Sequence, residues 1–264
     1  MDLKLSNKTA LVTGSTAGIG YAIAKGLASE GATVIINGRK ADDMADRIED
    51  LKKETGNVDI TGIAADFSKK EEIDNLIKEI PDVDILVNNV GIFNQVDFEN
   101  ISDEEWFEMF EVNVMSGVRL SRHYFPKMLK KNEGRIIFIS SESALNIPTE
   151  MVHYGFSKTA QLAISRGLAR LSKGSNVTVN CVLPGPTMSR ANAQDLEIQA
   201  KENNTTVEAV IEEFFEKRRP SSLIQRFANV EEVANMVVYI ASPLSSATNG
   251  AALRVDGGVA NYII

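Results

Sequence analysis

Cysteine and histidine are scarce in this chain of 264 residues, and long apolar runs are absent. Its single cysteine, Cys181, excludes an internal disulfide, and the apolar residues around it predict a buried strand position. No run approaches the roughly 18 apolar residues that a membrane-spanning helix needs. Residues 1–9 are polar and lack the apolar core of an export signal. We therefore expect a cytoplasmic protein that does not associate with a membrane.

The few histidines and basic clusters also exclude two classes of ligand. His123 and His153 are far apart in the sequence and have no cysteine or carboxylate at ligand spacing, so we assign no metal. On a helix His153 would point about 100° away from Tyr154, which favours a cap or surface role. The basic run at 217–219 is too short for a nucleic-acid footprint on a chain of net charge −8. Nucleic acid is therefore not an expected partner.

Apolar residues make up 44% of the chain, enough for a full core, and they are grouped in an alternating pattern. Seven short runs typical of strands occupy 9–12, 33–36, 60–64, 83–87, 135–139, 177–183 and 251–255, and helical segments include 41–55, 69–80, 102–131 and 151–173. This pattern predicts an α/β fold of the Rossmann type, with a doubly wound, parallel, seven-stranded sheet and helices on both faces. No linker divides the chain, so we expect one catalytic domain over 1–264.

Residues 187–227 interrupt this alternation because they carry no strand signal. Residues 205–208, Thr-Thr-Val-Glu, resemble a capping box, and Val210, Ile211, Phe214 and Phe215 follow at helical spacing. Long irregular segments in compact domains are usually functional, which favours a helical lid over the substrate. A helix packed on the body, or an oligomer contact, would give the same pattern.

A glycine-rich turn follows the first predicted strand. Residues 13–20 read Thr-Gly-Ser-Thr-Ala-Gly-Ile-Gly and lead into a helical pattern. Gly14 permits a tight turn, Gly18 lets the backbone approach a diphosphate, and Gly20 permits close packing of helix on strand. The N-terminus of the helix can then hold an anion. An ordinary turn between strand and helix is the alternative.

Tyr154 and Lys158 are spaced to share one face of a helix. Free tyrosine titrates near about 10, and a fixed cation beside it lowers its pKa by favouring the phenolate. Such a pair can perform general acid–base chemistry. The same spacing occurs on many solvated helices, so the other motifs must support this interpretation.

Together with these motifs, five others resemble the short-chain dehydrogenase/reductase family over nearly the whole chain. Residues 88–91, Asn-Asn-Val-Gly, are similar to the family's Asn-Asn-Ala-Gly, and Asn113 matches its helix asparagine. Ser140 and Ser141 end the fifth strand. Residues 184–187, Pro-Gly-Pro-Thr, and 256–258, Asp-Gly-Gly, match later signatures. The similarity is greatest to members like the 3-oxoacyl-carrier-protein reductases, and the valine in the first motif removes no reactive group.

The resemblance implies an enzyme that transfers a hydride between a nicotinamide dinucleotide and a carbonyl or secondary alcohol. Tyr154 would be the catalytic acid or base, and Lys158 would lower its pKa and bind the nicotinamide ribose. Ser141 would hydrogen-bond the substrate oxygen, with Ser140 as the fallback. Asn113 would hold a helix kink and a water that relays protons to Lys158.

The end of the second strand, residues 37–40, indicates which dinucleotide binds. An acidic residue there accepts from the 2′-hydroxyl of NAD, whereas an arginine favours the 2′-phosphate of NADP. Here Arg39 can present a bidentate fork and no carboxylate follows until residue 42. We therefore expect NADP(H) to be favoured over NAD(H), with Ser15 and Asn37 as helpers. An Arg39 that points into solvent is the alternative.

The remaining cofactor contacts come from the resemblance. Asp66 would contact the adenine, although an aspartate that caps the next helix would look the same. The full expected set is Gly14, Ser15, Gly18, Ile19, Gly20, Arg39, Asp66, Phe67, Asn89, Gly91, Tyr154, Lys158, Pro184, Gly185 and Thr187.

Other functions stay open. An NAD-dependent alcohol dehydrogenase of the same family would share these motifs. A non-catalytic, dinucleotide-binding regulatory protein would show damage among the four catalytic positions, all of which are intact, and a sugar-nucleotide epimerase or dehydratase would need an acidic residue after the second strand. Glu142 either tunes the pocket or faces water.

The substrate and the assembly are less closely defined. The residues expected to form the pocket walls are Phe93, Asn94, 143–151, Met188, Phe214 and Phe215. These walls suggest an apolar small-molecule carbonyl or alcohol as the substrate. The resemblance implies a homotetramer built through 102–131, 151–173 and the last strand. A stripe of small and apolar residues on the second of these helices suits a close contact or covers the sheet; it includes Ala160, Ala163, Ile164, Gly167 and Leu168.

Overall fold

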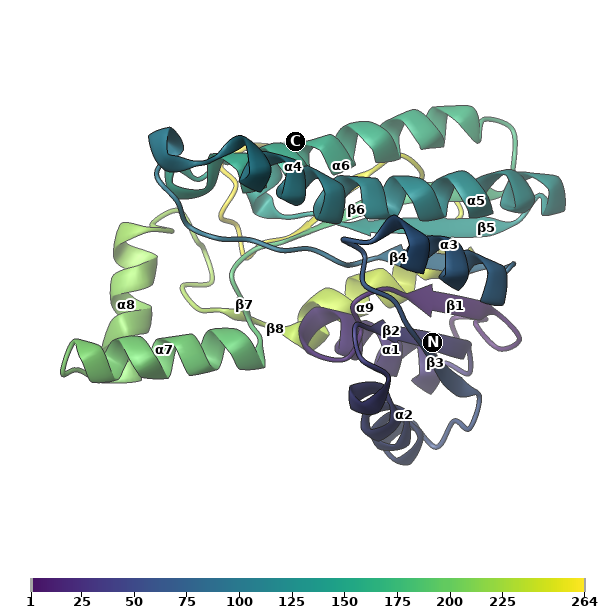
Figure 1. Cartoon of the computed structure of the whole chain (residues 1–264), viewed down its shortest axis with the longest axis horizontal. Helices are drawn as coiled ribbons and strands as arrows, with labels where there is room; N and C mark the ends of the chain where they lie inside the picture. The colour runs from purple at the N-terminus through teal and green to yellow at the C-terminus, as the bar shows by residue number, and fades with distance from the viewer. Residues whose placement is uncertain (1, 264) are drawn as a thin grey trace.

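The structure, a computed structural model, describes residues 2–263 and is built around one parallel sheet (Figure 1). Its strands are β1 (Thr9–Val12), β2 (Thr33–Gly38), β3 (Ile60–Ala64), β4 (Ile85–Asn88), β5 (Gly134–Ile139), β6 (Val177–Pro184) and β9 (Ala252–Val255). Their order is β3-β2-β1-β4-β5-β6-β9. The seven-stranded, doubly wound sheet predicted from the sequence is confirmed. The order reverses between β1 and β4, which opens a crevice at their carboxyl ends.

Helices cover both faces of the sheet. One face carries α1 (Gly18–Ser29), α2 (Ala41–Thr55) and α9 (Val230–Ala241), and the other carries α3 (Lys70–Glu79), α4 (Asp103–Phe110), α5 (Ser116–Lys131) and α6 (Val152–Leu171). In β1, Ala10 and Val12 pack toward α1 and α9, whereas Leu11 packs toward the opposite layer. Both sides of the strands are therefore apolar. No helix among residues 2–263 is long and apolar enough to cross a bilayer.

The segment predicted as one helix over 102–131 is interrupted. A π-helical turn, Glu111–Met115, separates α4 from α5, and Asn113 lies at its centre. The hydroxyl of Ser116 donates to the carbonyl of Val112 at 2.6 Å within this turn. The apolar pattern runs on through the turn, so periodicity alone predicts one continuous helix, and only the family resemblance at Asn113 indicated a kink here.

Residues 187–229 differ most from the expectation. Two helices lie here, α7 (Arg190–Glu202) and α8 (Val207–Lys217), although only the second was predicted. Two short strands that were not predicted, β7 (Thr187–Met188) and β8 (Ala228–Asn229), pair at its base. Each has two residues, too few to show a period. The two helices project from the body as an arm (Figure 1) with a small core of Leu196, Ala200 and Val210.

The start of α8 is also shifted by one residue from the predicted capping box. The N-cap is Thr206, whose hydroxyl accepts from the amide of Ala209 at 3.2 Å. The box predicted between positions 205 and 208 is therefore wrong, because Glu208 lies in the first turn instead of closing the cap.

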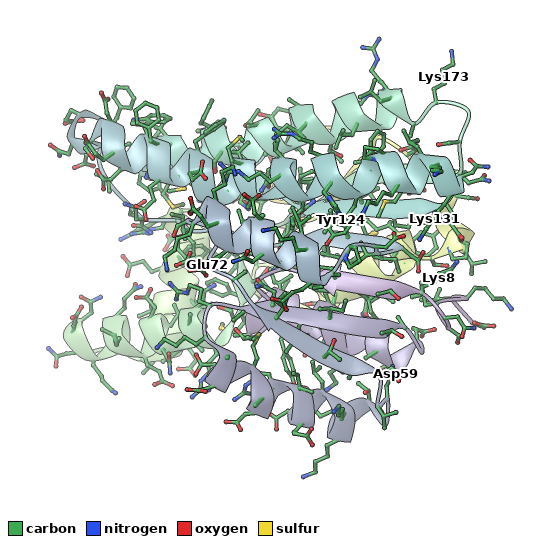
Figure 2. The ribbon with its side chains drawn as sticks, turned by 45° about the vertical axis from the view of Figure 1, so that its right-hand side comes forward. Lys8, Asp59, Glu72, Tyr124, Lys131 and Lys173 are labelled. Atoms are coloured by element: carbon green, nitrogen blue, oxygen red, sulfur yellow. The ribbon has the colours of Figure 1, made fainter. Side chains whose placement is uncertain are left out.

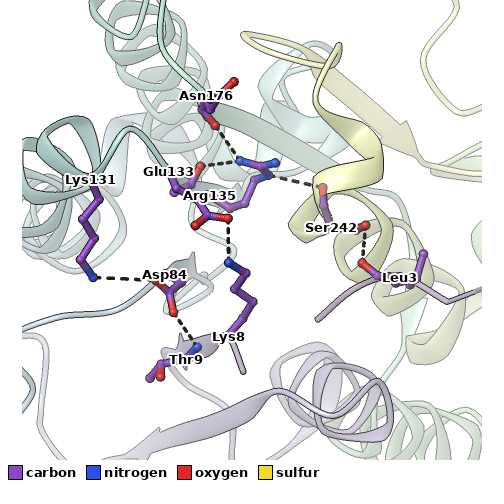
Figure 3. Close-up of polar contacts among 10 residues, drawn as sticks. Leu3, Lys8, Thr9, Asp84, Lys131, Glu133, Arg135, Asn176 and Ser242 are labelled. Atoms are coloured by element: carbon purple, nitrogen blue, oxygen red, sulfur yellow. Dashed lines mark hydrogen bonds and ion pairs between the residues drawn. The ribbon is translucent and has the colours of Figure 1, made fainter. Parts of the chain in front are cut away.

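The amino ends of the strands lie at the end of the molecule opposite the arm. Figure 2 shows Lys8, Asp59, Lys131 and Lys173 gathered there. Figure 3 shows how buried Arg135 at the start of β5 donates to the carbonyl of Asn176 at 2.9 Å. On the face covered by α3, α5 and α6, Tyr124 of α5, labelled in Figure 2, lies beneath the helices. Its hydroxyl donates to the carbonyl of Ile80 at 2.7 Å. With these ends fixed, the carboxyl ends of all the strands point toward the arm.

Candidate active site

A cavity of about 620 Å³ lies between the carboxyl ends of the strands and the arm. Its wall draws on the turn before α1, the ends of β4, β5 and β6, the start of α6, and the arm. Ten residues predicted for the site line it: Ile19, Gly20, Asn89, Gly91, Ser141, Tyr154, Lys158, Pro184, Gly185 and Thr187. The fold thus brings together side chains that are widely separated in the sequence.

The glycine turn has the geometry that the sequence predicts. Gly14 has a φ of 59°, and a Cβ on Gly20 would lie 2.3 Å from the carbonyl oxygen of Gly14. No side chain fits at position 20, so helix and turn pack closely. The N-cap of α1 is Ala17, which supplies no side-chain acceptor, and the first turn has no acidic residue. Free amide groups therefore face the cavity, and they fit the diphosphate of a dinucleotide.

Two predicted helpers of the 2′-phosphate are turned inward. The hydroxyl of Ser15 donates to the carbonyl of Val12 at 2.7 Å and accepts from the amide of Asn37 at 2.9 Å. Asn37 in turn accepts from the amide of Gly14 at 3.0 Å through Oδ1. Both side chains are buried. Their polar side-chain atoms hold the glycine turn against β2, so any help they give to the cofactor is through the shape of this turn.

The adenine side of the crevice is more open. Arg39 is exposed at the end of β2. Asp66 Oδ1 accepts from the amide and the hydroxyl of Ser68 at 3.0 and 2.8 Å, and these hydrogen bonds, with a smaller effect of Arg39, hold its pKa below the usual value. Asp66 therefore shapes the turn before α3, close to its predicted alternative role. Phe67 is 3% exposed and packs in the core, so its side chain is not at a cofactor surface.

Asn113 joins three parts of the site. Its Oδ1 accepts from the amide of Ile92 at 2.7 Å, and its Nδ2 donates to the carbonyl of Ile92 and the hydroxyl of Ser157, both at 2.9 Å. Its own main-chain carbonyl accepts from Gln161 Nε2 at 2.6 Å. The predicted kink is present as the π-helical turn. Asn113 is 1% exposed, so it is not a solvated amide, and it fixes the β4 loop against α6.

Lys158 and Tyr154 lie side by side on the first turns of α6. The Lys158 ammonium is 5.6 Å from the centre of the tyrosine ring and donates to the carbonyl of Ile139 at 2.9 Å. Burial lowers the pKa of Lys158 to about 8 and raises the pKa of Tyr154 to about 12. The lowered Tyr154 pKa that the sequence predicted is not found, because burial is the dominant effect on this phenol.

The two serines at the end of β5 have different partners. The hydroxyl of Ser141 lowers the pKa of the Tyr154 phenol and so partly offsets the rise caused by burial. The Ser141 hydroxyl also accepts from the amide of Ser143 at 3.1 Å. Ser140 donates instead to the main-chain carbonyl of Lys158 at 2.9 Å. Ser141 therefore faces the tyrosine, and the fallback Ser140 secures α6.

Two side chains lie where the sequence did not place them. His153, expected as a cap or surface residue, is fully buried, and its Nε2 lies 2.7 Å from Asn94 Oδ1. Burial is also the main cause of its lowered pKa. The contact holds Asn94 away from the cavity wall where it was expected. Trp106 packs edge-on against the imidazole at 5.9 Å, which explains the burial.

The cavity is more polar than expected. Of the predicted walls, five residues line it: Phe93, Ser143, Glu150, Met151 and Phe214. Phe215 is 2% exposed in the arm, and Met188 packs against the arm's core. An ion pair is present instead. Glu142 Oε1 accepts from Arg219 Nε at 2.8 Å, and both residues line the cavity.

Arg219 was not predicted as a site residue, because the pattern at 217–219 was interpreted only as a short basic run. The useful signal was an arginine next to a proline directly after an amphipathic helix. Within residues 2–263, no three His, Cys, Asp or Glu side chains gather in a way that could hold a metal ion.

A model of the short chain dehydrogenase family matches residues 8–200. The chain belongs to the short-chain dehydrogenase/reductase family. It is 49% identical, over 100% of both chains, to the Bacillus subtilis protein called uncharacterized oxidoreductase YvaG. It is 34% identical to the 3-oxoacyl-[acyl-carrier-protein] reductase FabG of Aquifex aeolicus, over 98% of this chain and 100% of the relative. The protein is thus an oxidoreductase of this family, as the motifs predicted.

A solved structure is similar over the full length. L-sorbose reductase from Gluconobacter frateurii, complexed with NADPH and L-sorbose, covers 100% of both chains at 31% identity and a TM-score of 0.93. This agreement confirms the fold, and the family binds a nicotinamide dinucleotide.

Proposed function

We propose that this protein is an NADP(H)-dependent oxidoreductase that interconverts a ketone and a secondary alcohol, with Tyr154 as the acid and base. The observation that carries the proposal is the meeting of Ser141, Tyr154 and Lys158 in one cavity that continues to the bare N-terminus of α1. A proton donor, a hydroxyl to orient the carbonyl and an anion site are thus adjacent.

The bound nicotinamide would supply or take up the hydride, and the residues would manage the proton. Tyr154 keeps its proton at neutral pH because its pKa is about 12, so it serves as the acid in reduction. Ser141 orients the carbonyl oxygen toward it. The phenolate that results is stabilised by the Lys158 ammonium near the ring. Asn113 keeps Lys158 in place through the hydroxyl of Ser157 on the same helix.

NADP(H) is the favoured cofactor in this proposal. Arg39 is exposed at the end of β2, where a 2′-phosphate would lie, and no acidic residue precedes position 42. The similar L-sorbose reductase structure holds NADPH. The expected cofactor residues Asn89, Pro184 and Thr187 line the cavity and would surround the nicotinamide, and Gly18 in the glycine turn would lie at the diphosphate. The arm of α7 and α8 would act as the lid of a single cytoplasmic catalytic domain.

The assembly is proposed to be a homotetramer. The stripe on α6 divides into two sets: Ile164 and Leu168 pack on the sheet, whereas Ala163 and Gly167 are exposed. Phe107 of α4 and Phe156 of α6 are also exposed, at 72% and 46%. Small residues flanked by exposed aromatic rings suit a close contact between helices of two copies.

The test of the proposed function is a panel of ketones and secondary alcohols, assayed by nicotinamide absorbance with NADPH, NADP⁺, NADH and NAD⁺. Turnover with the phosphorylated cofactors supports the proposal. Turnover with NADH alone would identify an NAD-dependent dehydrogenase of the same family. Cofactor binding without turnover of any member would favour a regulatory protein and overturn the proposal.

A further inference from the structure

Glu142 is a carboxylate enclosed in the cavity wall directly after Ser141. It is 3% exposed. Its Oε1 accepts from Arg219 Nε at 2.8 Å and from the hydroxyl of Ser143 at 3.4 Å. Its Oε2 is buried and has no hydrogen-bond partner among residues 2–263. A buried carboxylate oxygen is stable only with a donor beside it, so this atom is suited to a donor on the ligand.

Arg219 fixes the position and the charge of this group. Its Nη1 donates to the carbonyl of Arg218 at 2.8 Å, and its amide donates to the carbonyl of Phe214 in α8 at 3.1 Å. The side chain is 11% exposed, so the pair is shielded from solvent. Because Arg219 already neutralises Glu142, this guanidinium is not available to pair with an acidic substrate.

The pair also lies close to the reacting hydroxyl. Burial is the main cause of the raised pKa of Tyr154, but the charge of Glu142 raises it further and the charge of Arg219 lowers it. Glu142 directly follows Ser141 and lines the same cavity as Tyr154, so a substrate whose carbonyl oxygen meets Ser141 and Tyr154 would have its neighbouring carbons on the side of Glu142.

We propose that Glu142, held by Arg219, accepts a hydrogen bond from a substrate hydroxyl on a carbon adjacent to the carbonyl. This inference rests on the proposed function and names its substrate class: hydroxylated ketones and the corresponding vicinal diols. An alkyl ketone has no O–H group to offer and leaves Oε2 unpaired, so the site discriminates against it. This conclusion replaces the apolar substrate that the sequence suggested.

The test compares matched ketones that differ by one hydroxyl: 3-hydroxybutan-2-one with butan-2-one, and 2-hydroxycyclohexanone with cyclohexanone. We expect kcat/KM to be about tenfold to a hundredfold higher for the hydroxylated member of each pair, because only that member makes a hydrogen bond to the charged Glu142. Glu142→Gln removes the charge and should reduce this ratio severalfold.

A double variant, Glu142→Leu with Arg219→Met, replaces the ion pair by apolar side chains, an exchange that buried pairs often tolerate. It should bring the ratio close to one while butan-2-one is still reduced. Glu212→Gln removes a carboxylate from the exposed face of α8 and serves as the control, with an unchanged ratio. Calorimetric titration of the same ketones into Tyr154→Phe measures the preference without turnover.

Equal use of both members by the unmodified enzyme, or a preference for the alkyl ketone, would overturn the inference and leave the proposed function intact. An aminoketone that outperforms the hydroxyketone would also overturn it, because the donor would then be a cation. Absence of turnover with every ketone would defeat the proposed function, and the titrations would still decide the inference: equal affinities reject it, and tighter binding of the hydroxylated members supports it.

Discussion

Arg39→Ala should remove most of the preference for NADPH over NADH. Arg39 is exposed at the end of β2, and the nearby polar groups of Ser15 and Asn37 are committed to the glycine turn. In the proposed function, Arg39 is therefore the expected main contact for a 2′-phosphate. A hydrogen bond to a charged group contributes about 1.5–3 kcal/mol, and exposure places this one near the lower end. The expected loss is about tenfold to thirtyfold in the ratio of kcat/KM values.

The assay is steady-state kinetics with each cofactor at two ionic strengths. The loss should fall on NADPH alone, and it should shrink at high salt because the charges are partly screened. Arg47→Ala is the matched control, since Arg47 lies further along α2 and pairs with Asp50 at 3.0 Å. Equal or better use of NADH by the unmodified enzyme would refute the reasoning, as would an equal loss with both cofactors.

The reverse change should turn the preference toward NADH. An aspartate at position 38 would repel the 2′-phosphate and accept from the 2′-hydroxyl. A Cβ on Gly38 would lie 2.6 Å from Cγ2 of Thr16, so Gly38→Asp needs Thr16→Ser beside it. The double variant should prefer NADH, and an unchanged ratio would show that the 2′-phosphate lies elsewhere.

Three further predictions concern the stability of the fold, the affinity for the cofactor and the assembly. Asn113→Ala strips partners from Ile92 and Ser157 and should lower the free energy of unfolding by about 2–4 kcal/mol in denaturant titrations, whereas the exposed Asn100→Ala should change it little. The affinity for NADPH should weaken as the pH rises through about 8, because Lys158 loses its proton there. Lys158→Arg should flatten this pH profile between pH 7 and about 10. A flat profile in the unmodified enzyme would contradict the role of Lys158 in binding the cofactor. Gly167→Trp should dissociate the proposed tetramer in light scattering, because a Cβ there meets nothing within 4 Å of its own chain, and Gly167→Ala should leave it intact. An intact tetramer with tryptophan would place the interface elsewhere.

The sequence predicted those features that depend on local pattern. The strands, the glycine turn and the Tyr154–Lys158 face follow from periodicity and spacing, which the backbone geometry fixes. Features that depend on distant partners were not predictable. Ser15 turns inward because Asn37 lies across from it, and His153 is buried because Trp106 and Asn94 cover it.

The cavity wall illustrates the same limit. Glu142 could face water or the pocket by sequence alone, and only the position of Arg219 after α8 decides between the two. The raised pKa of Tyr154 likewise reflects the enclosure of the whole site, which spacing to Lys158 does not reveal.

The most direct test of the account is single-turnover oxidation of NADPH by Tyr154→Phe with a ketone that the unmodified enzyme reduces. The change removes one hydroxyl from a half-buried ring and keeps its packing against Phe93 at 6.0 Å, so the fold and NADPH affinity should remain. We predict that the rate falls by about a thousandfold or more, in line with the loss of a general acid. A variant that retains more than a few per cent of the rate would show that another group delivers the proton.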